Sequence, residues 1–183
     1  MKKCRVCRQP FEPRQPMQAV CGVACAKELA ASIRGKAEKQ AAIKQRKADR
    51  ERKEKLKSRS ELAREAQAAF NAWVRLRDAD KPCISCGRHH EGQYHAGHYM
   101  SVGGHSAALR FDENNTHKQC SVCNNYKSGN LVEYRPNLIV KIGLEEVERL
   151  EGPHDPKKYT IDELRELLSV YQAKNKEWAK SQS

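Results

Sequence analysis

Residues 26–80 form the longest uniform pattern in the chain, a charged segment with a helix-forming composition. Gly35 is its only glycine, it contains no proline, and Ala, Lys, Arg, Glu and Gln dominate it. Large apolar residues are scarce up to residue 60, but from Leu62 onward they recur at helical spacing. We expect one long helix with at most one break, whose last part, residues 60–79, packs on the module that follows. The residues of that packing face are Leu62, Ala66, Phe70, Trp73, Val74 and Leu76.

Two more helices are predicted near the C-terminus. A short one runs from Leu144 to Leu150 and ends at a proline-containing loop, residues 152–156. A second one covers residues 161–179, where apolar residues again recur at helical spacing. Thr160 and Glu163 have the spacing of a capping box, in which both side chains accept hydrogen bonds from free N–H groups at the helix start. We expect these C-terminal helices to be scaffold rather than site.

All eight cysteines occur as close pairs, three with two intervening residues and one with three. Zinc takes four ligands in a tetrahedron, and two such pairs supply four thiolates. The first two pairs would hold one ion and the last two a second. Both ions would be structural, because four thiolates leave no open coordination position; redox-active or simply reduced thiols are the alternative. The two predicted ligand sets are Cys4, Cys7, Cys21 and Cys25, and Cys83, Cys86, Cys120 and Cys123.

The overall composition argues against one large apolar core. Hydrophobic residues make up 38% of the 183 residues and charged residues 32%, compared with about 45–50% and about 25% in a typical globular domain. Small modules joined by a solvated, charged segment fit these proportions better. We predict an α+β protein with a zinc-binding module at residues 1–25, a basic helical arm or linker at 26–60, a zinc-stapled core with its leading helix at 61–143, and C-terminal helices at 144–183.

The formal net charge of +12 favours a polyanionic partner. No apolar run approaches the ~18 residues that span a bilayer, and no apolar stretch follows the N-terminal charges. We therefore expect a cytoplasmic protein that binds nucleic acid rather than membrane. Residues 27–59 carry thirteen Lys or Arg and five Asp or Glu, a local net charge of +8. A basic arm along a phosphate backbone and a solvated helix explain this segment equally well. The candidate phosphate contacts are Lys44, Arg46, Lys47, Arg50, Arg52, Lys53, Arg110, Lys118 and Lys127.

Between the last two cysteine pairs the chain carries His98, near the end of the first strand of a predicted β-hairpin, and Asn115. Asn124 directly follows the final pair. This order resembles the HNH, or ββα-metal, nuclease family, in which a two-stranded ribbon and a helix clamp one divalent ion. The resemblance implies that His98 is the general base and that Asn115 orients it through a side-chain hydrogen bond. It also implies that Asn124 coordinates a catalytic Mg²⁺ or Mn²⁺.

One position departs from that pattern. Many members of the family have an aspartate just before the catalytic histidine, and this chain has Gly97 there. His95 would lie on the same strand face as Gly97, because alternate residues of a strand share a face. We therefore expect His95 to take over as a metal ligand, with a surface or packing role as the alternative. The roles of His105 and His117 stay open.

The resemblance extends over nearly the whole chain. The N-terminal cysteine pairs, the charged helix, the segment 95–99 and the segment 109–124 are similar to the lambdoid phage NinG (Rap) recombination endonucleases. That likeness implies cleavage of branched DNA, such as Holliday junctions or D-loops, in phage recombination. Paired incisions at a junction would suit a homodimer. A zinc-dependent DNA-binding protein without catalysis is the alternative, and Gly97 favours it. A zinc-stapled adaptor for other proteins is a weaker third hypothesis.

Overall fold

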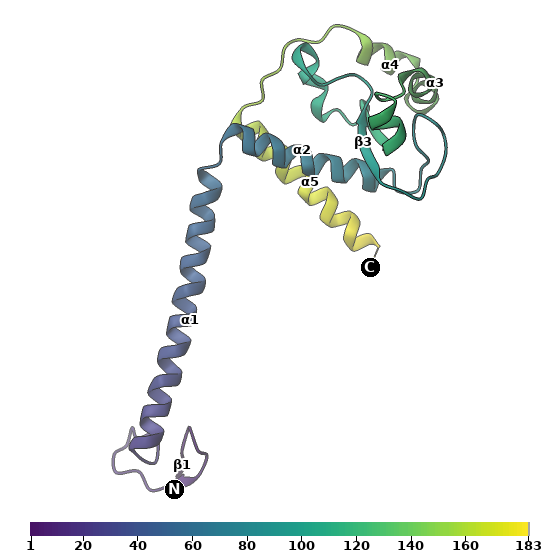
Figure 1. Ribbon diagram of the computed structural model, residues 1–183. Helices are drawn as coiled ribbons and strands as arrows, with labels where there is room; N and C mark the ends of the chain where they lie inside the picture. Colours follow the sequence, from purple (N-terminus) through teal and green to yellow (C-terminus); the bar gives the residue numbers. More distant parts are fainter. Residues whose placement is uncertain (183) are drawn as a thin grey trace. The chain divides into compact units, whose positions relative to one another are not determined.

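The computed structural model describes residues 1–182, apart from the side chains of residues 104–106 (Figure 1). It has the mixed α+β character predicted from the sequence, with two small antiparallel sheets and mostly helices around them. The chain divides into two compact units, Met1–Lys57 and Ser58–Ser183. The four predicted segments therefore group into two, and residue 143 does not separate one unit from another.

The first unit consists of a small ribbon followed by one long helix. Strand β1 (Lys2–Lys3) pairs antiparallel with β2 (Pro10–Phe11), and helix α1 covers Val23–Lys55. Cys25 lies in the first turn of α1. None of the described residues of α1 is buried, so helix-forming composition and the basic residues of its last turn, which face the negative end of the helix dipole, stabilise it in place of packing.

The predicted break in the charged segment falls at residues 56–58. The Ser58 hydroxyl accepts a hydrogen bond from the Glu61 N–H at 3.3 Å, and the Glu61 carboxylate accepts one from the Ser58 N–H at 2.8 Å. This capping box starts a new helix, α2 (Arg59–Arg77). The buried residues of α2 are Leu62, Ala66, Phe70 and Val74, which confirms the apolar face expected from the sequence.

Helix α2 packs along α5 (Ile161–Ser181), and the two form the framework of the second unit (Figure 1). Phe70 meets Tyr171 edge to face with 4.9 Å between ring centroids, and Phe111 completes this aromatic core. The capping box that begins α5 is formed as predicted, since the Thr160 hydroxyl accepts from the Glu163 N–H at 3.2 Å. The C-terminal helix is thus part of the unit that holds the central module.

The central module is built on a two-stranded antiparallel ribbon. Strand β3 (Tyr94–His98) pairs with β4 (Thr116–Cys120), and η1 (Gly104–Phe111), a 3₁₀-helix, lies between them in the chain. His95 pairs with Gln119 and Gly97 pairs with His117, so these four residues share one face of the ribbon. One turn of π-helix, η2 (Val122–Tyr126), follows β4 directly.

A second apolar core lies beside the ribbon. Helices α3 (Leu131–Ile142) and α4 (Leu144–Glu151) pack together, and α4 confirms the short helix predicted there. The buried members of this core are Tyr99, Leu109, Tyr134, Leu138, Val147 and Leu150. Since Tyr99 directly follows β3, this core anchors the end of the ribbon at which His98 lies.

Within the described residues, no helix is both long enough and apolar enough to cross a membrane.

Candidate functional site

Both predicted cysteine quartets are assembled. In each, the four Sγ atoms lie within 4.8 Å of one another, and a zinc ion with Zn–S bonds of about 2.3 Å requires S–S separations of about 3.8 Å. In the first unit the Sγ atom of Cys21 lies 3.6 Å from those of Cys7 and Cys25. The donor set and its spacing therefore fit a tetrahedral zinc in both units.

The second quartet ties the loop before β3 to the end of β4. Cys83, Cys120 and Cys123 are nearly fully buried. The backbone N–H of Cys120 donates to the Cys83 sulfur at 3.3 Å, and that of Cys123 donates to the Cys120 sulfur at 3.5 Å. N–H donors of this kind favour the thiolate form that zinc binds. This zinc site would set the position of η2 relative to the ribbon.

His98 is the last residue of β3, and its ring is held on both sides. Its Nε2 lies 3.1 Å from the carbonyl oxygen of Arg110, and its ring stacks on Phe70 at 6.4 Å between centroids. A carbonyl oxygen only accepts, so Nε2 carries the proton and Nδ1 keeps the free lone pair. Burial lowers the pKa of His98 below its ordinary 6.5, which outweighs the opposite effect of the Arg110 carbonyl. His98 is thus a neutral imidazole with a defined basic nitrogen.

Asn115 is fully buried, but its side chain binds backbone rather than the His98 ring. Its Oδ1 accepts from the Met100 N–H at 2.8 Å, and its Nδ2 donates to the carbonyl oxygens of Met100 and Leu109 at 3.1 and 3.3 Å. The predicted orienting contact is therefore made by the Arg110 carbonyl. Asn115 affects the orientation of His98 only indirectly, because it binds the backbone of Leu109, the residue before Arg110.

The ribbon face around Gly97 is crowded with amide oxygens. A Cβ atom at Gly97 would lie 2.1 Å from Oε1 of Gln119 and 3.0 Å from Oδ1 of Asn124, so no side chain fits there without displacing Gln119. Nε2 of His95 and Oε1 of Gln119 are buried and have no hydrogen-bond partner among the described residues. The structure therefore brings the two predicted metal ligands, His95 and Asn124, to the same face.

Gln119 belongs to this face and was missed in the sequence. Only the pairing register places it opposite His95, and residue spacing along the chain does not contain that register. A polar residue in a fully buried strand would have been the signal, but burial of β4 on both faces becomes visible only in the fold.

His117 supports the backbone at Gly97. It is 2% exposed, and its Nδ1 lies 3.3 Å from the Tyr134 hydroxyl, which donates to the Gly97 carbonyl at 3.1 Å. Burial, together with the charges of Lys141 and Arg77, lowers the pKa of His117 to about 3. A neutral, enclosed imidazole of this kind is structural. The side chain of His105 lies outside the described residues.

The predicted phosphate contacts divide into exposed and enclosed residues. Lys118 is only 6% exposed, and its ammonium donates to the Ala79 carbonyl at 2.8 Å and lies over the Tyr94 ring. Lys118 is therefore not available for DNA contact, because its ammonium is already bound inside the protein. Lys127 is exposed, and so are the six basic candidates on α1, which are Lys44, Arg46, Lys47, Arg50, Arg52 and Lys53.

Arg110 opens onto a basic pocket of about 230 Å³. Arg59 and Lys158 contribute further positive charge to its lining, and Lys157 lines it with its ammonium paired to the Glu163 carboxylate at 2.5 Å. The carbonyl of the same Arg110 holds the His98 ring. A polyanion bound in this pocket would thus lie next to the candidate base.

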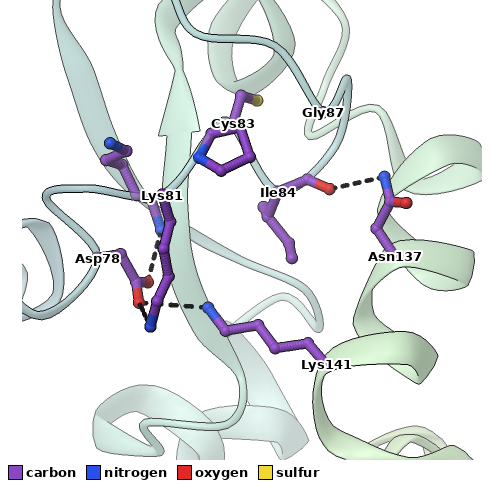
Figure 2. A pocket seen from close by; sticks show the side chains of 9 residues that line it. Asp78, Lys81, Cys83, Ile84, Gly87, Asn137 and Lys141 are labelled. Carbon is purple, nitrogen blue, oxygen red and sulfur yellow. Dashed lines mark hydrogen bonds and ion pairs between the residues drawn. The ribbon is translucent and has the colours of Figure 1, made fainter.

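A different pocket, of about 200 Å³, lies where the end of α2 meets α3 and the loop before β3 that contains Cys83 and Cys86, called the zinc loop below (Figure 2). Its charges are already paired, because Asp78 accepts from Lys81 at 3.3 Å and from Lys141 at 3.2 Å. Burial alone would raise the pKa of Asp78, but hydrogen bonding and charge from Arg77, with the charge of Lys141, hold it well below the ordinary 3.8. This buried ionic cluster joins elements of the second unit and is structural.

Comparison with known proteins agrees with the resemblance to the NinG family. The family described as "Bacteriophage Lambda NinG protein" matches residues 1–181. "Protein ninG" of Escherichia phage 933W is 42% identical over all of this chain and 96% of its own length. "Protein ninG" of Escherichia phage lambda is 48% identical over 72% of this chain and 64% of its own length. No solved structure matches. The chain therefore belongs to the NinG family of bacteriophage lambda and related phages.

Proposed function

We propose that this NinG-family protein is a metal-dependent DNA endonuclease of the HNH type. The observation that carries the proposal is the state of His98, a neutral histidine at the end of a zinc-stapled ribbon whose Nε2–H is held by a backbone carbonyl. That arrangement leaves Nδ1 free as a base of known tautomer. The neighbouring residue Gly97 lies on the other face of the strand, close to the His95 imidazole and the Asn124 amide oxygen. These two donors suit a divalent ion.

The chemistry assigned to the chain's own residues is a proton transfer. Nδ1 of His98 takes a proton from a water molecule, and the resulting hydroxide attacks the phosphorus of a phosphodiester as the bond to the 3′ oxygen breaks. The Arg110 carbonyl stabilises the imidazolium that forms, because it accepts from Nε2 in both protonation states. A bound Mg²⁺ or Mn²⁺ would supply Lewis acidity for the phosphate and charge stabilisation for the leaving oxygen.

His98 and the ion-facing residues project from opposite faces of the strand. His98 is the final residue of β3, so a phosphate placed across this end of the ribbon is reachable from both sides. The proposal therefore places the scissile phosphate at the end of the ribbon where His98 pairs with Thr116.

Positive charge supports a DNA substrate. The basic pocket at Arg110 lies beside the base, and α1 carries exposed Lys and Arg along its length. Each phosphate neutralised by such residues releases counterions and strengthens binding. Branched DNA is the proposed substrate on the strength of the family resemblance, and a homodimer would permit paired incisions at a junction.

A DNA-binding protein without catalysis is the second candidate, and the specific observation in its favour is Gly97. No acidic side chain occupies the place next to the base, and none fits while Gln119 lies there. Under this hypothesis the two zinc-binding quartets and the basic surface serve binding alone.

One experiment separates the two candidates. Purified protein with its zinc content measured is incubated with a four-way junction, a D-loop and linear duplex of equal sequence, with and without added Mn²⁺ or Mg²⁺. The endonuclease proposal expects metal-dependent products that form faster on branched than on linear DNA. Tight binding to all three substrates with no product at any ion concentration would establish the non-catalytic candidate. Equal cleavage of all substrates would retain the nuclease but remove the preference for branches.

A further inference from the structure

We propose that Gln119 is a ligand of the catalytic divalent ion, with its side-chain oxygen Oε1 in the place of the acidic group missing at Gly97. The inference rests on the proposed function, because it concerns the ion of that same site. It adds a ligand from β4 to the two residues, His95 and Asn124, expected from the sequence. Three features of the fold carry it: the orientation of the Gln119 amide, the space at Gly97, and an unpaired nitrogen on His95.

The orientation of the Gln119 amide is determined by its hydrogen bonds. Its Nε2 donates to the Ser85 hydroxyl at 2.6 Å and to the Gly129 carbonyl at 2.5 Å. A carbonyl cannot donate, so the amide nitrogen must face Gly129 and the amide oxygen must face the other way. Gln119 is 0% exposed, and its Oε1 is buried without a hydrogen-bond partner among the described residues. The fold thus presents a bare oxygen to the ribbon face at Gly97.

The amide oxygens of Gln119 and Asn124 converge on Gly97. Both lie within 3.0 Å of the point that a Cβ atom of Gly97 would occupy. The Asn124 amide is also oriented, because its Nδ2 donates to Oδ1 of Asn125 at 2.8 Å. An aspartate at position 97 would begin from this same point. Gly97 leaves the space that the Gln119 side chain fills. The oxygen donor that an aspartate on β3 would supply therefore comes from Gln119 on β4.

His95 supplies a nitrogen on the same face. It is the cross-strand partner of Gln119 in the β3–β4 register, and side chains of such a pair are direct neighbours. Its Nε2 is buried and lacks a hydrogen-bond partner among the described residues. Buried polar atoms nearly always have a hydrogen-bond partner, so two unpaired atoms on neighbouring side chains indicate that a bound ion or molecule lies between them. A cation accepts lone pairs from both.

The combined donor set is one imidazole nitrogen and two amide oxygens. Such donors suit Mn²⁺ or Mg²⁺, which keep several coordination positions for water and phosphate oxygens. All three donors are uncharged, so the ion would be held more weakly than by a carboxylate and would gain affinity from the DNA phosphate. A buried water molecule bound to His95 and Gln119 is the competing explanation for the two unpaired atoms.

The test measures ion binding without DNA and without turnover. Zinc-loaded protein is titrated with Mn²⁺, and free Mn²⁺ is quantified by electron paramagnetic resonance. Gln119→Met keeps the length of the side chain and removes the oxygen, and we expect at least a tenfold loss of Mn²⁺ affinity. Asn124→Ala should show a similar loss. Gln93→Met makes the same chemical change at an exposed position just before β3 and should bind like the wild type.

Ser85→Ala controls for a purely structural effect. It removes one partner of the Gln119 Nε2 but leaves Oε1 in place, so we expect Mn²⁺ affinity within about threefold of the wild type. Zinc content and melting temperature are measured for every variant. A loss of Mn²⁺ binding in Ser85→Ala equal to that in Gln119→Met would assign the effect to packing and overturn the inference.

The outcomes separate this inference from the proposed function. If Gln119→Met binds Mn²⁺ normally while Asn124→Ala does not, the ion site stands and Gln119 is not part of it. If the wild type binds no Mn²⁺ at saturating concentration, the assignment of Gln119 fails, and the cleavage assay with added Mn²⁺ or Mg²⁺ decides the proposed nuclease separately. Should Gln119→Met not fold, a crystal of the wild type with Mn²⁺ decides. Anomalous scattering is expected to place the ion in direct coordination contact with Oε1, and an ion bound elsewhere, or none at saturating Mn²⁺, would overturn the assignment.

Discussion

Nε2 of His98 lies 3.1 Å from the backbone carbonyl oxygen of Arg110. This contact links the end of β3 to the end of η1, and it sets the tautomer of the histidine without using any other side chain. It also connects the proposed base to a basic pocket, because the Arg110 side chain lines that pocket. A substitution at Arg110 retains the carbonyl, so binding and base orientation are separable at one residue.

Replacement of His98 tests the base directly. His98→Ala should lower metal-dependent cleavage by about 10²- to 10⁴-fold, the usual contribution of a general base, while zinc content and DNA affinity stay at wild-type values. His89→Ala, at an exposed position of the zinc loop, is the matched control and should cleave normally. Cleavage by His98→Ala at the wild-type rate would remove His98 from the mechanism.

The protonation of His98 gives the cleavage reaction a predictable pH dependence. Burial lowers the pKa of His98 below 6.5, so the neutral, basic form persists to lower pH than for a free histidine. We expect the cleavage rate to fall on the acid side with a midpoint below pH 6.5. Titration of the His98 ring by NMR in protein without added Mg²⁺ or Mn²⁺ isolates this group. A midpoint above 6.5 would contradict the burial argument.

The neighbours Asn114 and Asn115 form a natural pair for a stability measurement. Asn115→Ala removes the side-chain partner of the Met100 N–H and of the Met100 carbonyl, and it removes one of the two donors to the Leu109 carbonyl, which also accepts from the Asp112 N–H. We therefore expect the free energy of unfolding to drop by about 3 kcal/mol. Asn114 is exposed and bonds only the Glu146 carboxylate through its side chain. Asn114→Ala should cost less than about 1 kcal/mol. Urea unfolding followed by tryptophan fluorescence reports both, and equal effects would contradict the buried role of Asn115.

The two zinc sites should be separable, because they lie in different units. Cys21→Ser is expected to lower bound zinc from two ions to one and to leave hydrogen exchange of β4 unchanged. Cys120→Ser should remove the other ion and expose the β4 amides to exchange, since that quartet ties β4 to the loop before β3. Metal analysis and hydrogen exchange measure the two effects. Protected β4 amides in Cys120→Ser would show that the ribbon is stable without its zinc.

Salt dependence tests the role of α1 in DNA binding. The triple variant Lys44→Gln, Lys47→Gln and Lys53→Gln should reduce the slope of log K against log salt concentration by up to about 0.9 for each phosphate that is no longer neutralised. Lys176→Gln with Lys180→Gln, at exposed positions of α5, serves as a control and should leave the slope unchanged. An unchanged slope in the triple variant would identify α1 as a solvated helix rather than a DNA-binding arm.

Local patterns predicted much of the fold. The helix start at Thr160, the apolar face of α2 and the end of β3 at His98 were all predictable, because each depends on residues close together in the chain. The cysteine quartets were also predictable, since zinc needs four ligands and the pairs leave none unassigned. The break at Ser58 was predicted only as a single interruption somewhere in the charged segment, although its capping box has a recognisable spacing.

The sequence by itself determined which residues are proposed to carry the chemistry: eight thiols for zinc, His98 at a strand end, and Asn124 after the last cysteine. Tertiary structure decided how they are held. The β3–β4 register brings Gln119 opposite His95 and against Gly97, the fold gives His98 the Arg110 carbonyl in place of Asn115, and burial withdraws Lys118 from the surface. The physical reason is that these contacts join residues distant in the chain, and their geometry depends on strand register and core packing, which short-range spacing does not encode.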